Sequence, residues 1–380
     1  LKVPKRDFYA VAEPTWKLAI KFLWGPRREF FYTFAPEYEQ TWPELSRPSG
    51  YYHDHETRWV GPISALTAQD KAFPRNPDGS PQLQTPHAFH IENQKLVAWL
   101  EGHAQKLGVV VEDGNVTGVE TGPVRTTGRE EKGVHAMILA DGRRIAADLF
   151  VDASGFRSEL IGRGLEEPYQ SFERSLFCDR AVIGGWSRTN EVIKPYTIAE
   201  TMDAGWAWQI EHEKFINRGY VYSSSHMDDE TARAELLRKN PSIPEDRTRV
   251  VKYRSGRRSR SWVGNVVGVG NSTGFVEPLE ATALGKIVLE CVNLAEMLAE
   301  TGQRPGPVMV DIYNQFHGEK WDDIRDFLAV HYAFNTRSDT PFWRDCRDKT
   351  ELGGAARVVD YYKENGPSTL ARGIILNETN

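Results

Sequence analysis

Two glutamates and three glycines gather between residues 268 and 284. This stretch reads GVGNSTGFVEPLEATAL, and Glu280 is the second of two carboxylates three positions apart. A partly desolvated carboxylate can position a reacting group or stabilise a cationic intermediate. Gly268, Gly270 and Gly274 would let backbone N–H groups approach a phosphate closely. Their spacing differs from the dinucleotide fingerprint, so a packing or helix-capping turn is an equally good interpretation.

A lysine within an apolar segment is the second candidate for chemistry. Residues 16–24 read WKLAIKFLW, and their apolar side chains alternate with polar or small ones, which predicts a strand. Between aromatic walls Lys17 would lose hydration, and its amine would become a nucleophile or a precise hydrogen-bond donor. The alternative places lysines on a solvated face, which we accept for Lys21.

The glycine-rich stretch lies between two predicted elements. The apolar residues 262–267 predict a strand before it, and the apolar periodicity of residues 284–298 predicts a helix after it. Pro278 suits a turn or the start of a helix. The order strand, glycine turn and helix is typical of a site where a helix N-terminus faces an anion.

With these motifs the chain resembles the flavin-dependent halogenases of the tryptophan-halogenase type. Their signature is Gly-Asn-x-x-x-Phe-Val-Glu-Pro-Leu-Glu-x-Thr, and their catalytic lysine lies in an aromatic-Lys-x-Ala-Ile-Lys-Phe strand. The resemblance implies catalytic roles for Lys17 and Glu280. It also implies a halide site at the backbone N–H groups of Thr282 and Ala283. A capping box on an ordinary helix is the competing interpretation of this stretch.

The same resemblance implies FAD, used in its reduced form, with chloride or bromide and with O2 as co-substrate. The expected cofactor-binding residues are Gly268, Gly270, Asn271, Gly274, Phe275, Pro278, Leu284, Ala153, Ser154 and Gly155. The last three follow the apolar residues 149–152, where a plain turn is the alternative. The basic run Arg254–Arg260 would meet a cofactor phosphate or form a solvated strand edge.

Aromatic residues predict the substrate side. By resemblance, Tyr32 and Phe34 hold the substrate, with Tyr32 standing where the tryptophan-specific enzymes have His. Trp206 and Trp208 share one strand face and resemble the Trp-x-Trp-x-Ile-Pro element, which separates organic substrate from flavin. Glu211 replaces the proline of that element. Core packing explains these aromatic residues equally well.

Other patterns predict the scaffold. A helix over residues 90–107 should end at Gly108. Short strands are expected at 109–112 and 116–119, a hairpin of 136–140 with 145–152 around Asp141-Gly142, and a helix over 310–334.

Composition excludes several functional classes. The 380 residues are 40% hydrophobic with net charge −6, which predicts a large core and makes nucleic acid an unlikely target. Three cysteines lack metal or CxxC spacing, which favours a reducing compartment. We expect no metal at His53-Asp54-His55-Glu56. With no apolar run of membrane length and no signal peptide, we expect a cytoplasmic protein.

The predicted fold class is mixed α/β, similar to the FAD-binding fold of flavoprotein monooxygenases. Residues 1–300 should form the FAD-binding and halogenase module, with FAD-side pieces at about 87–160 and 250–300, substrate-side pieces at about 1–86 and 161–249, and a helical part at 301–380. No Gly-x-Gly-x-x-Gly occurs in the chain, so we expect that unit of the family before Leu1. The segment that grips the backbone of free tryptophan would follow Asn380.

These features predict FADH2-dependent halogenation of an electron-rich aromatic substrate, of indole or phenol type, by hypohalous acid relayed to Lys17. A separate flavin reductase is the expected partner, and the sequence leaves the oligomeric state open. An aromatic hydroxylase on the same fold is the first alternative, favoured by Glu211. A binding protein that has lost its nucleotide unit is the second.

Overall fold

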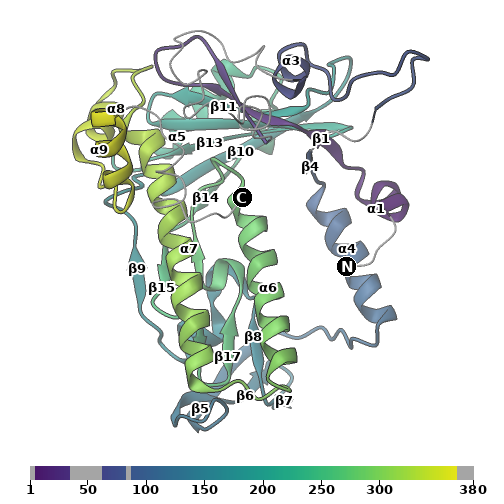
Figure 1. Cartoon of the computed structure of the whole chain (residues 1–380), viewed down its shortest axis with the longest axis vertical. Helices are drawn as coiled ribbons and strands as arrows, with labels where there is room; N and C mark the ends of the chain where they lie inside the picture. Colours follow the sequence, from purple (N-terminus) through teal and green to yellow (C-terminus); the bar gives the residue numbers. More distant parts are fainter. Residues whose placement is uncertain (1–4, 35–61, 83–86, 366–380) are drawn as a thin grey trace.

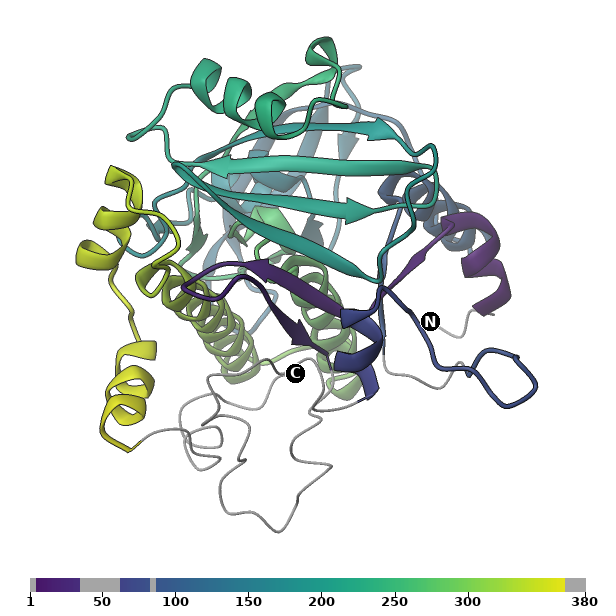
Figure 2. The ribbon, with the colours of Figure 1, turned by 90° about the horizontal axis from the view of Figure 1, so that it is seen from above.

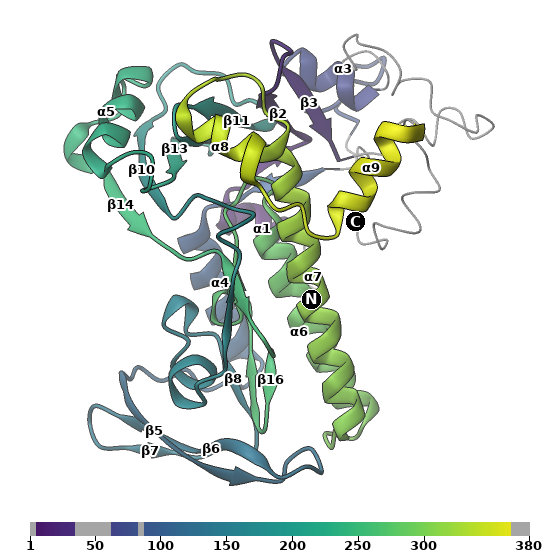
Figure 3. The same ribbon diagram turned by 90° about the vertical axis from the view of Figure 1, so that its left-hand side faces the viewer.

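The computed structural model describes residues 5–34, 62–82 and 87–365. A seven-stranded sheet lies at one end of the molecule and smaller sheets lie at the other (Figure 1). The long helices α6 (Thr282–Glu300) and α7 (Pro307–Ala333) run side by side between these two ends (Figure 3). The expected mixed α/β class is confirmed.

The large sheet has the strand order β14-β10-β13-β12-β11-β2-β3. Its strands are β2 (Ala19–Leu23), β3 (Phe30–Thr33), β10 (Arg180–Ser187), β11 (Tyr196–Met202), β12 (Gly205–Glu211), β13 (Phe215–Tyr222) and β14 (Arg249–Lys252). Neighbouring strands are antiparallel except β2 and β11, which are parallel. Two parallel strands need a long connection between them. Accordingly, β2 comes from the N-terminal segment, whereas most of the sheet is built from residues 180–252.

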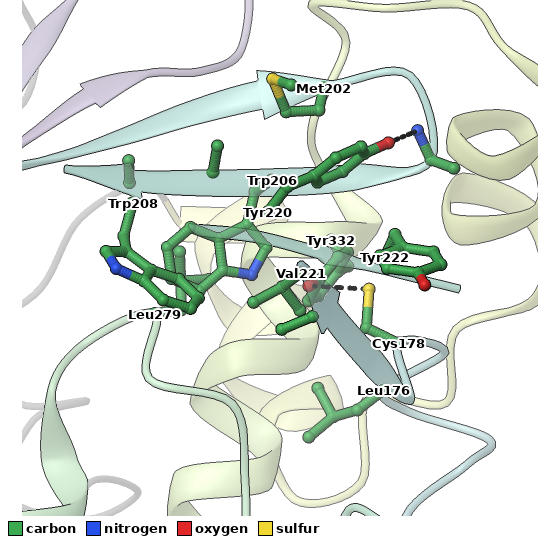
Figure 4. Packing of buried hydrophobic residues seen from close by; sticks show 14 of the residues in the cluster. Leu176, Cys178, Met202, Trp206, Trp208, Tyr220, Val221, Tyr222, Leu279 and Tyr332 are labelled. Atoms are coloured by element: carbon green, nitrogen blue, oxygen red, sulfur yellow. Dashed lines mark hydrogen bonds between the residues drawn. The ribbon is translucent and has the colours of Figure 1, made fainter. Parts of the chain in front are cut away.

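Large aromatic side chains fill the main core. Trp206, Tyr220 and Tyr332 are almost completely buried and join β12 and β13 to α7 (Figure 4). Trp343, on α8 (Pro341–Lys349), is buried in the same cluster. A Cβ at Gly219 would lie 2.1 Å from the Trp208 indole, so glycine is required where β13 passes that ring.

Four smaller sheets complete the strands described. They are β1 (Thr15–Lys17) with β4 (Ala88–His90); β5 (Val116–Val124), β6 (Glu131–Leu139) and β7 (Arg144–Ile145); β8 (Phe150–Asp152), β16 (Trp262–Val263) and β17 (Val266–Gly268); and β9 (Tyr169–Ser171), β15 (Gly256–Arg258) and β18 (Gly274–Phe275). These short strands place the glycine-rich stretch between β17 and α6.

The shorter helices lie around this frame. They are α1 (Lys5–Ala12), α3 (Pro62–Ala68), α4 (Asn93–Lys106), α5 (Asp229–Lys239) and α9 (Ala355–Asn365), with the single turns η3 (Gly155–Arg157), η5 (Glu245–Arg247) and η6 (Gly270–Ser272) and the π-helix η4 (Glu159–Gly164). Helix α5 packs against β10 and β13 (Figure 2). No helix within the described ranges is long and apolar enough to cross a membrane.

Most expected elements are confirmed. Helices α4, α6 and α7 match the predictions, and Gly108 follows α4 with φ +88°. The hairpin at Asp141-Gly142 is present between β6 and β7. The division of the chain into FAD-side, substrate-side and C-terminal parts stays a prediction.

Three strand predictions were wrong, and a fourth strand is present in two parts. Residues 109–112 form no strand. The apolar run at 262–267 is a hairpin that turns at Gly264, whose φ is +54°. Residues 145–152 divide between β7 and β8, in different sheets. The strand expected over 16–24 is present as β1 and β2, which are divided at Leu18 because β1 pairs with β4 whereas β2 pairs with β11 and β3.

Candidate active site

Lys17 lies where β1 ends and the chain turns into the large sheet. It is only 5% exposed, and its Nζ lies 5.2 Å from the centroid of the Phe34 ring. Burial lowers the pKa of Lys17 to about 8, while the charge of Glu280 opposes that shift. The predicted desolvation of Lys17 is therefore present, and Lys17 and Glu280 are close enough to interact electrostatically.

Glu280 lies on the loop that leads from β18 into α6. The next residue, Ala281, adopts a left-handed conformation with φ 55°, which ends the loop and starts the helix. The Glu280 side chain is 4% exposed, and its Oε1 is 2.8 Å from Nε2 of His331 on α7. The Glu280 carboxylate is therefore desolvated, and a histidine of the long helix α7 holds it in place.

His331 is a residue of the site that the sequence reading missed. It lies among Phe327, Leu328 and Tyr332 in the apolar stripe of α7, where a single histidine gives no motif. Only its placement opposite Glu280 identifies it. A histidine three or four positions from aromatic residues on a predicted core helix was the one available signal.

The other glutamate of the motif is also held by α7. Glu277 is fully buried and accepts a hydrogen bond from the hydroxyl of Tyr332, the neighbour of His331. Burial raises the pKa of Glu277 to about 7, and this hydrogen bond opposes the rise. Two consecutive residues of α7 thus fix both glutamates of the loop.

The residues expected to bind halide begin α6. Thr282 and Ala283 are its first two residues, both are half-buried, and no side chain caps this N-terminus. The first N–H groups of a helix have no partner within the helix and carry the positive end of its dipole. This arrangement suits a small anion.

The glycines of the turn are used mainly for internal packing. The N–H of Gly270 donates to Oε2 of Glu290 at 2.7 Å, inside the protein. A Cβ at Gly268 would lie 2.5 Å from the Thr273 side chain, and one at Gly274 would lie 2.8 Å from the Trp321 ring. These three glycines are buried, and the structure gives a packing reason for each.

The remaining expected cofactor residues are accessible. Asn271, Phe275 and Gly155 are half-buried, and Pro278, Leu284, Ala153 and Ser154 are exposed. Gly155 has φ +68° and open space where a Cβ would lie. The turns η3 and η6 contact each other, and the rings of Phe156 and Phe275 lie 4.9 Å apart. The two segments that the sequence separates by more than a hundred positions therefore form one surface.

The two tryptophans of β12 lie in the main core. Their ring centroids are 6.1 Å apart, and Trp208 Nε1 donates to Asn217 Oδ1 at 2.7 Å. Both indoles pack in one cluster with Leu279, one residue before Glu280 (Figure 4). The predicted aromatic wall therefore packs against the loop that carries Glu280.

Phe34 and Tyr32 have different surroundings. Phe34 lies over the Lys17 amine, as given above, and packs against the main core. Tyr32 on β3 is 42% exposed. The structure thus joins Phe34 to the Lys17 site and places Tyr32 at the surface.

Comparison of the sequence with known protein families identifies the family of this chain. The sequence pattern of the family described as Tryptophan halogenase matches residues 1–378. The chain belongs to the tryptophan halogenase family. The resemblance stated from the lysine strand and the glycine-turn motif is thereby confirmed.

Individual relatives agree with the family assignment. The chain is 34% identical over 304 residues to the tryptophan 7-halogenase KtzQ of Kutzneria sp. (strain 744), covering 79% of this chain and 55% of that protein. It is 30% identical over 392 residues to the tryptophan 7-halogenase RebH of Lentzea aerocolonigenes, covering 96% and 71%. The chain therefore spans between about half and about 70% of the length of these relatives.

Solved structures share the fold. The crystal structure of MibH, a lathipeptide tryptophan 5-halogenase, superposes with a TM-score of 0.84 at 34% identity, covering 98% of this chain and 70% of that one. BrvH, a flavin-dependent halogenase from Brevundimonas sp. BAL3, gives a TM-score of 0.81 at 29% identity, covering 97% and 75%. The halogenase-type fold expected from the sequence is confirmed.

The residues present fit a flavin. The accessible surface of η3 and η6 offers an open glycine at positive φ beside the exposed Phe156 ring, which suits a flat nucleotide cofactor. The basic run Arg254–Arg260 gives little support to the prediction that it meets a cofactor phosphate. Arg257 pairs with Asp322 at 2.8 Å, and Arg260 with Glu167 at 2.8 Å, so both guanidinium groups have internal partners.

The position that departs from the family pattern has a charged partner. Glu211, at the end of β12, is 1% exposed and pairs with Arg188 at 2.5 Å. Its backbone carbonyl accepts a hydrogen bond from Thr15, two residues before Lys17. Glu211 therefore connects the tryptophan strand to the strand of the lysine.

The metal prediction concerns residues 53–56, which lie outside the described residues. Among the residues that the structure does describe, no group of three or more histidine, cysteine, aspartate or glutamate side chains could hold a metal ion. Cys178, Cys291 and Cys346 are all free thiols.

Proposed function

We propose that this protein halogenates an electron-rich aromatic substrate with hypohalous acid that Lys17 presents to the ring. The observation that carries the proposal is a buried lysine, whose pKa is about 8, within electrostatic reach of the buried carboxylate of Glu280. Membership of the tryptophan halogenase family supports it.

The first steps of the proposed reaction need a bound cofactor and a bound halide. Bound reduced FAD, renewed by a separate reductase, would supply with O2 the oxidising power that converts halide to hypohalous acid. The N-terminus of α6 at Thr282 and Ala283 would hold the halide. Residues of η3, η6 and the loop before α6 would hold the cofactor.

Lys17 would then receive the hypohalous acid, either as a haloamine or by a hydrogen bond to the acid. Its aromatic surroundings exclude water, which protects a reactive oxidant from loss. Glu280 would position that species or stabilise the cationic ring intermediate by its negative charge. Trp206 and Trp208 would separate the organic substrate from the cofactor.

The names of the relatives support the proposed substrate class. MibH is titled a lathipeptide tryptophan 5-halogenase, and KtzQ and RebH are named tryptophan 7-halogenases. Phe34, which borders the Lys17 site, would contact the ring of the substrate. We propose an indole or phenol ring, and a test panel should contain free tryptophan, tryptophan-containing peptides, simple indoles and phenols.

The test is mass spectrometry of products formed by the full-length protein with FAD, a flavin reductase, NADH, and chloride or bromide. Lys17→Ala should lower the yield of halogenated product at least about a hundredfold while FAD binding persists. Lys21→Ala, which removes the Lys21–Glu29 pair nearby, is the matched control and should retain activity. Full activity in Lys17→Ala would refute the role of Lys17, and a product heavier by one oxygen would favour the hydroxylase.

A further inference from the structure

His331 is held by acceptors on both sides of its ring. Nδ1 lies 2.9 Å from the backbone carbonyl oxygen of Phe327, one turn earlier in α7. Nε2 lies 2.8 Å from Oε1 of Glu280. The ring is packed between the aromatic rings of Phe327 and Phe22, with centroids at 4.9 and 5.5 Å, so it cannot rotate freely.

This geometry sets the number of protons on the ring. A carbonyl oxygen only accepts hydrogen bonds, so Nδ1 carries a proton. An ionised carboxylate also only accepts, so Nε2 carries a second proton, and the ring is then an imidazolium. A neutral His331 would require the shared proton to reside on Glu280.

We propose that His331 is a positioning residue for the halogenation described above, an imidazolium that donates to Glu280 and fixes this carboxylate within electrostatic reach of Lys17. The inference rests on the proposed function for its catalytic meaning, whereas the charge state of the pair is a property of the folded protein. Neither the sequence motifs nor the comparisons assign a role to this histidine.

The charges around the ring favour the imidazolium. Burial lowers the pKa of His331, but the hydrogen bond and charge of Glu280 outweigh it and raise the pKa above its usual value of 6.5. Glu277 adds to this rise from the same loop. The charge of Lys17, at the end of β1, interacts with the same carboxylate.

A consequence for Lys17 follows from this arrangement. An isolated carboxylate at Glu280 would hold the Lys17 amine protonated, because opposite charges attract strongly where water is excluded. The imidazolium offsets part of the Glu280 charge. His331 would thus keep Glu280 in place without forcing Lys17 to stay an ammonium.

Nitrogen NMR of the protein labelled with ¹⁵N-histidine tests the charge state directly. In the wild type, both ring nitrogens of His331 should remain protonated at pH values above 6.5. Glu280→Gln keeps the size of the side chain, and its amide can donate to a neutral ring. In that variant His331 should carry one proton, on Nδ1, at the same pH. A neutral His331 in the wild type, or a signal unaffected by Glu280→Gln, would overturn the inference.

Activity tests the positioning role separately. His331→Gln retains a hydrogen-bond donor but removes the charge, and it should lower kcat about tenfold or more and shift the pH profile, with unchanged FAD binding. It also removes the His331 signals and so assigns them. His226→Gln is the control, since it breaks a comparable histidine–carboxylate pair, with Asp345 at 3.2 Å, outside the site.

The two hypotheses fail in different ways. If the wild type yields no halogenated product, the proposed function falls, while the NMR result on the charge state still stands. If the wild type is active and His331→Gln matches His226→Gln in kcat and pH profile, the positioning role is refuted.

Discussion

The chemistry of the site depends on three side chains that have lost their water. The side chains of Lys17, Glu280 and His331 are each largely buried, and the charge of Glu280 favours the protonated form of both Lys17 and His331. Desolvation by itself favours the neutral lysine and the neutral histidine, so the charge of Glu280 opposes it at both residues. The site is therefore best understood as a coupled set rather than as a lysine with a separate glutamate.

The titration of Lys17 is the first prediction at this scale. With ¹³C-labelled lysine, one signal should titrate with its midpoint at about pH 8, and Lys17→Met should remove it. Glu280→Gln should lower that midpoint, because the carboxylate favours the ammonium. Since the pKa in the folded protein is depressed, stability should rise as pH increases from about 8 towards the ordinary lysine value of 10.5. A midpoint near 10.5 for the Lys17 signal would contradict the desolvation argument.

At the scale of elements, two helices hold the loops of the site in place. Glu290 on α6 accepts from the Gly270 N–H and pairs with Lys286 at 2.5 Å. Lys286 also lies 3.1 Å from Nδ1 of His317 on α7. This buried network fixes the glycine turn to α6 and α7, while His331 and Tyr332 fix the glutamate loop. The long helices thus determine the geometry on both sides of the site.

The connection between β12 and β1 gives a second prediction. Arg188→Ala would leave the buried carboxylate of Glu211 without its cationic partner, with only the Gln209 amide donating to it, which should cost about 3–5 kcal/mol of unfolding free energy. Urea denaturation measures the loss. Arg174→Ala is the control, because Arg174 and Glu351 form an exposed pair worth less than about 1 kcal/mol. Equal losses of unfolding free energy in the two variants would show that the buried Arg188–Glu211 pair stabilises the fold no more than an exposed pair does.

At the scale of the whole molecule, the segment after β2 and the C-terminal end of α7 meet next to the site. The indole N–H of Trp24, just after β2, donates to the carbonyl of His331 at 2.9 Å. Asn335, just after α7, accepts from the Gly25 N–H at 2.9 Å and donates to Thr201 at 3.0 Å. The strand that follows Lys17 and the helix that holds Glu280 are thereby joined directly.

A third prediction concerns this junction. Asn335→Ala should lower the free energy of unfolding by about 1–3 kcal/mol for each buried group left without a partner. Hydrogen exchange at the Gly25 amide should also become faster, because its acceptor is lost. Thr336→Ala, at an exposed neighbouring position, is the control. Unchanged exchange at Gly25 would mean that Asn335 does not hold the junction.

Contiguous motifs were readable from the sequence for a physical reason. The glycine turn, the glutamate loop and the start of α6 are neighbours along the chain, so their residue types and spacing already describe their local geometry. The amphipathic helices α6 and α7 and the hairpin at Asp141-Gly142 follow from short-range periodicity and turn chemistry. The resemblance of these local motifs to the halogenase family led to Lys17, Glu280, Thr282 and Ala283 as candidates.

Long-range pairing was outside the reach of those patterns. The division at Leu18 arises because β1 pairs with β4 whereas β2 pairs with β11, and the parallel pairing of β2 with β11 joins segments far apart in the chain. His331 has no motif around it, and Arg188 gave no sign that it would neutralise Glu211. The sequence by itself determined the family and the reactive residue types. Only the tertiary structure decided which buried charges face one another, because burial and partner are properties of the assembled core.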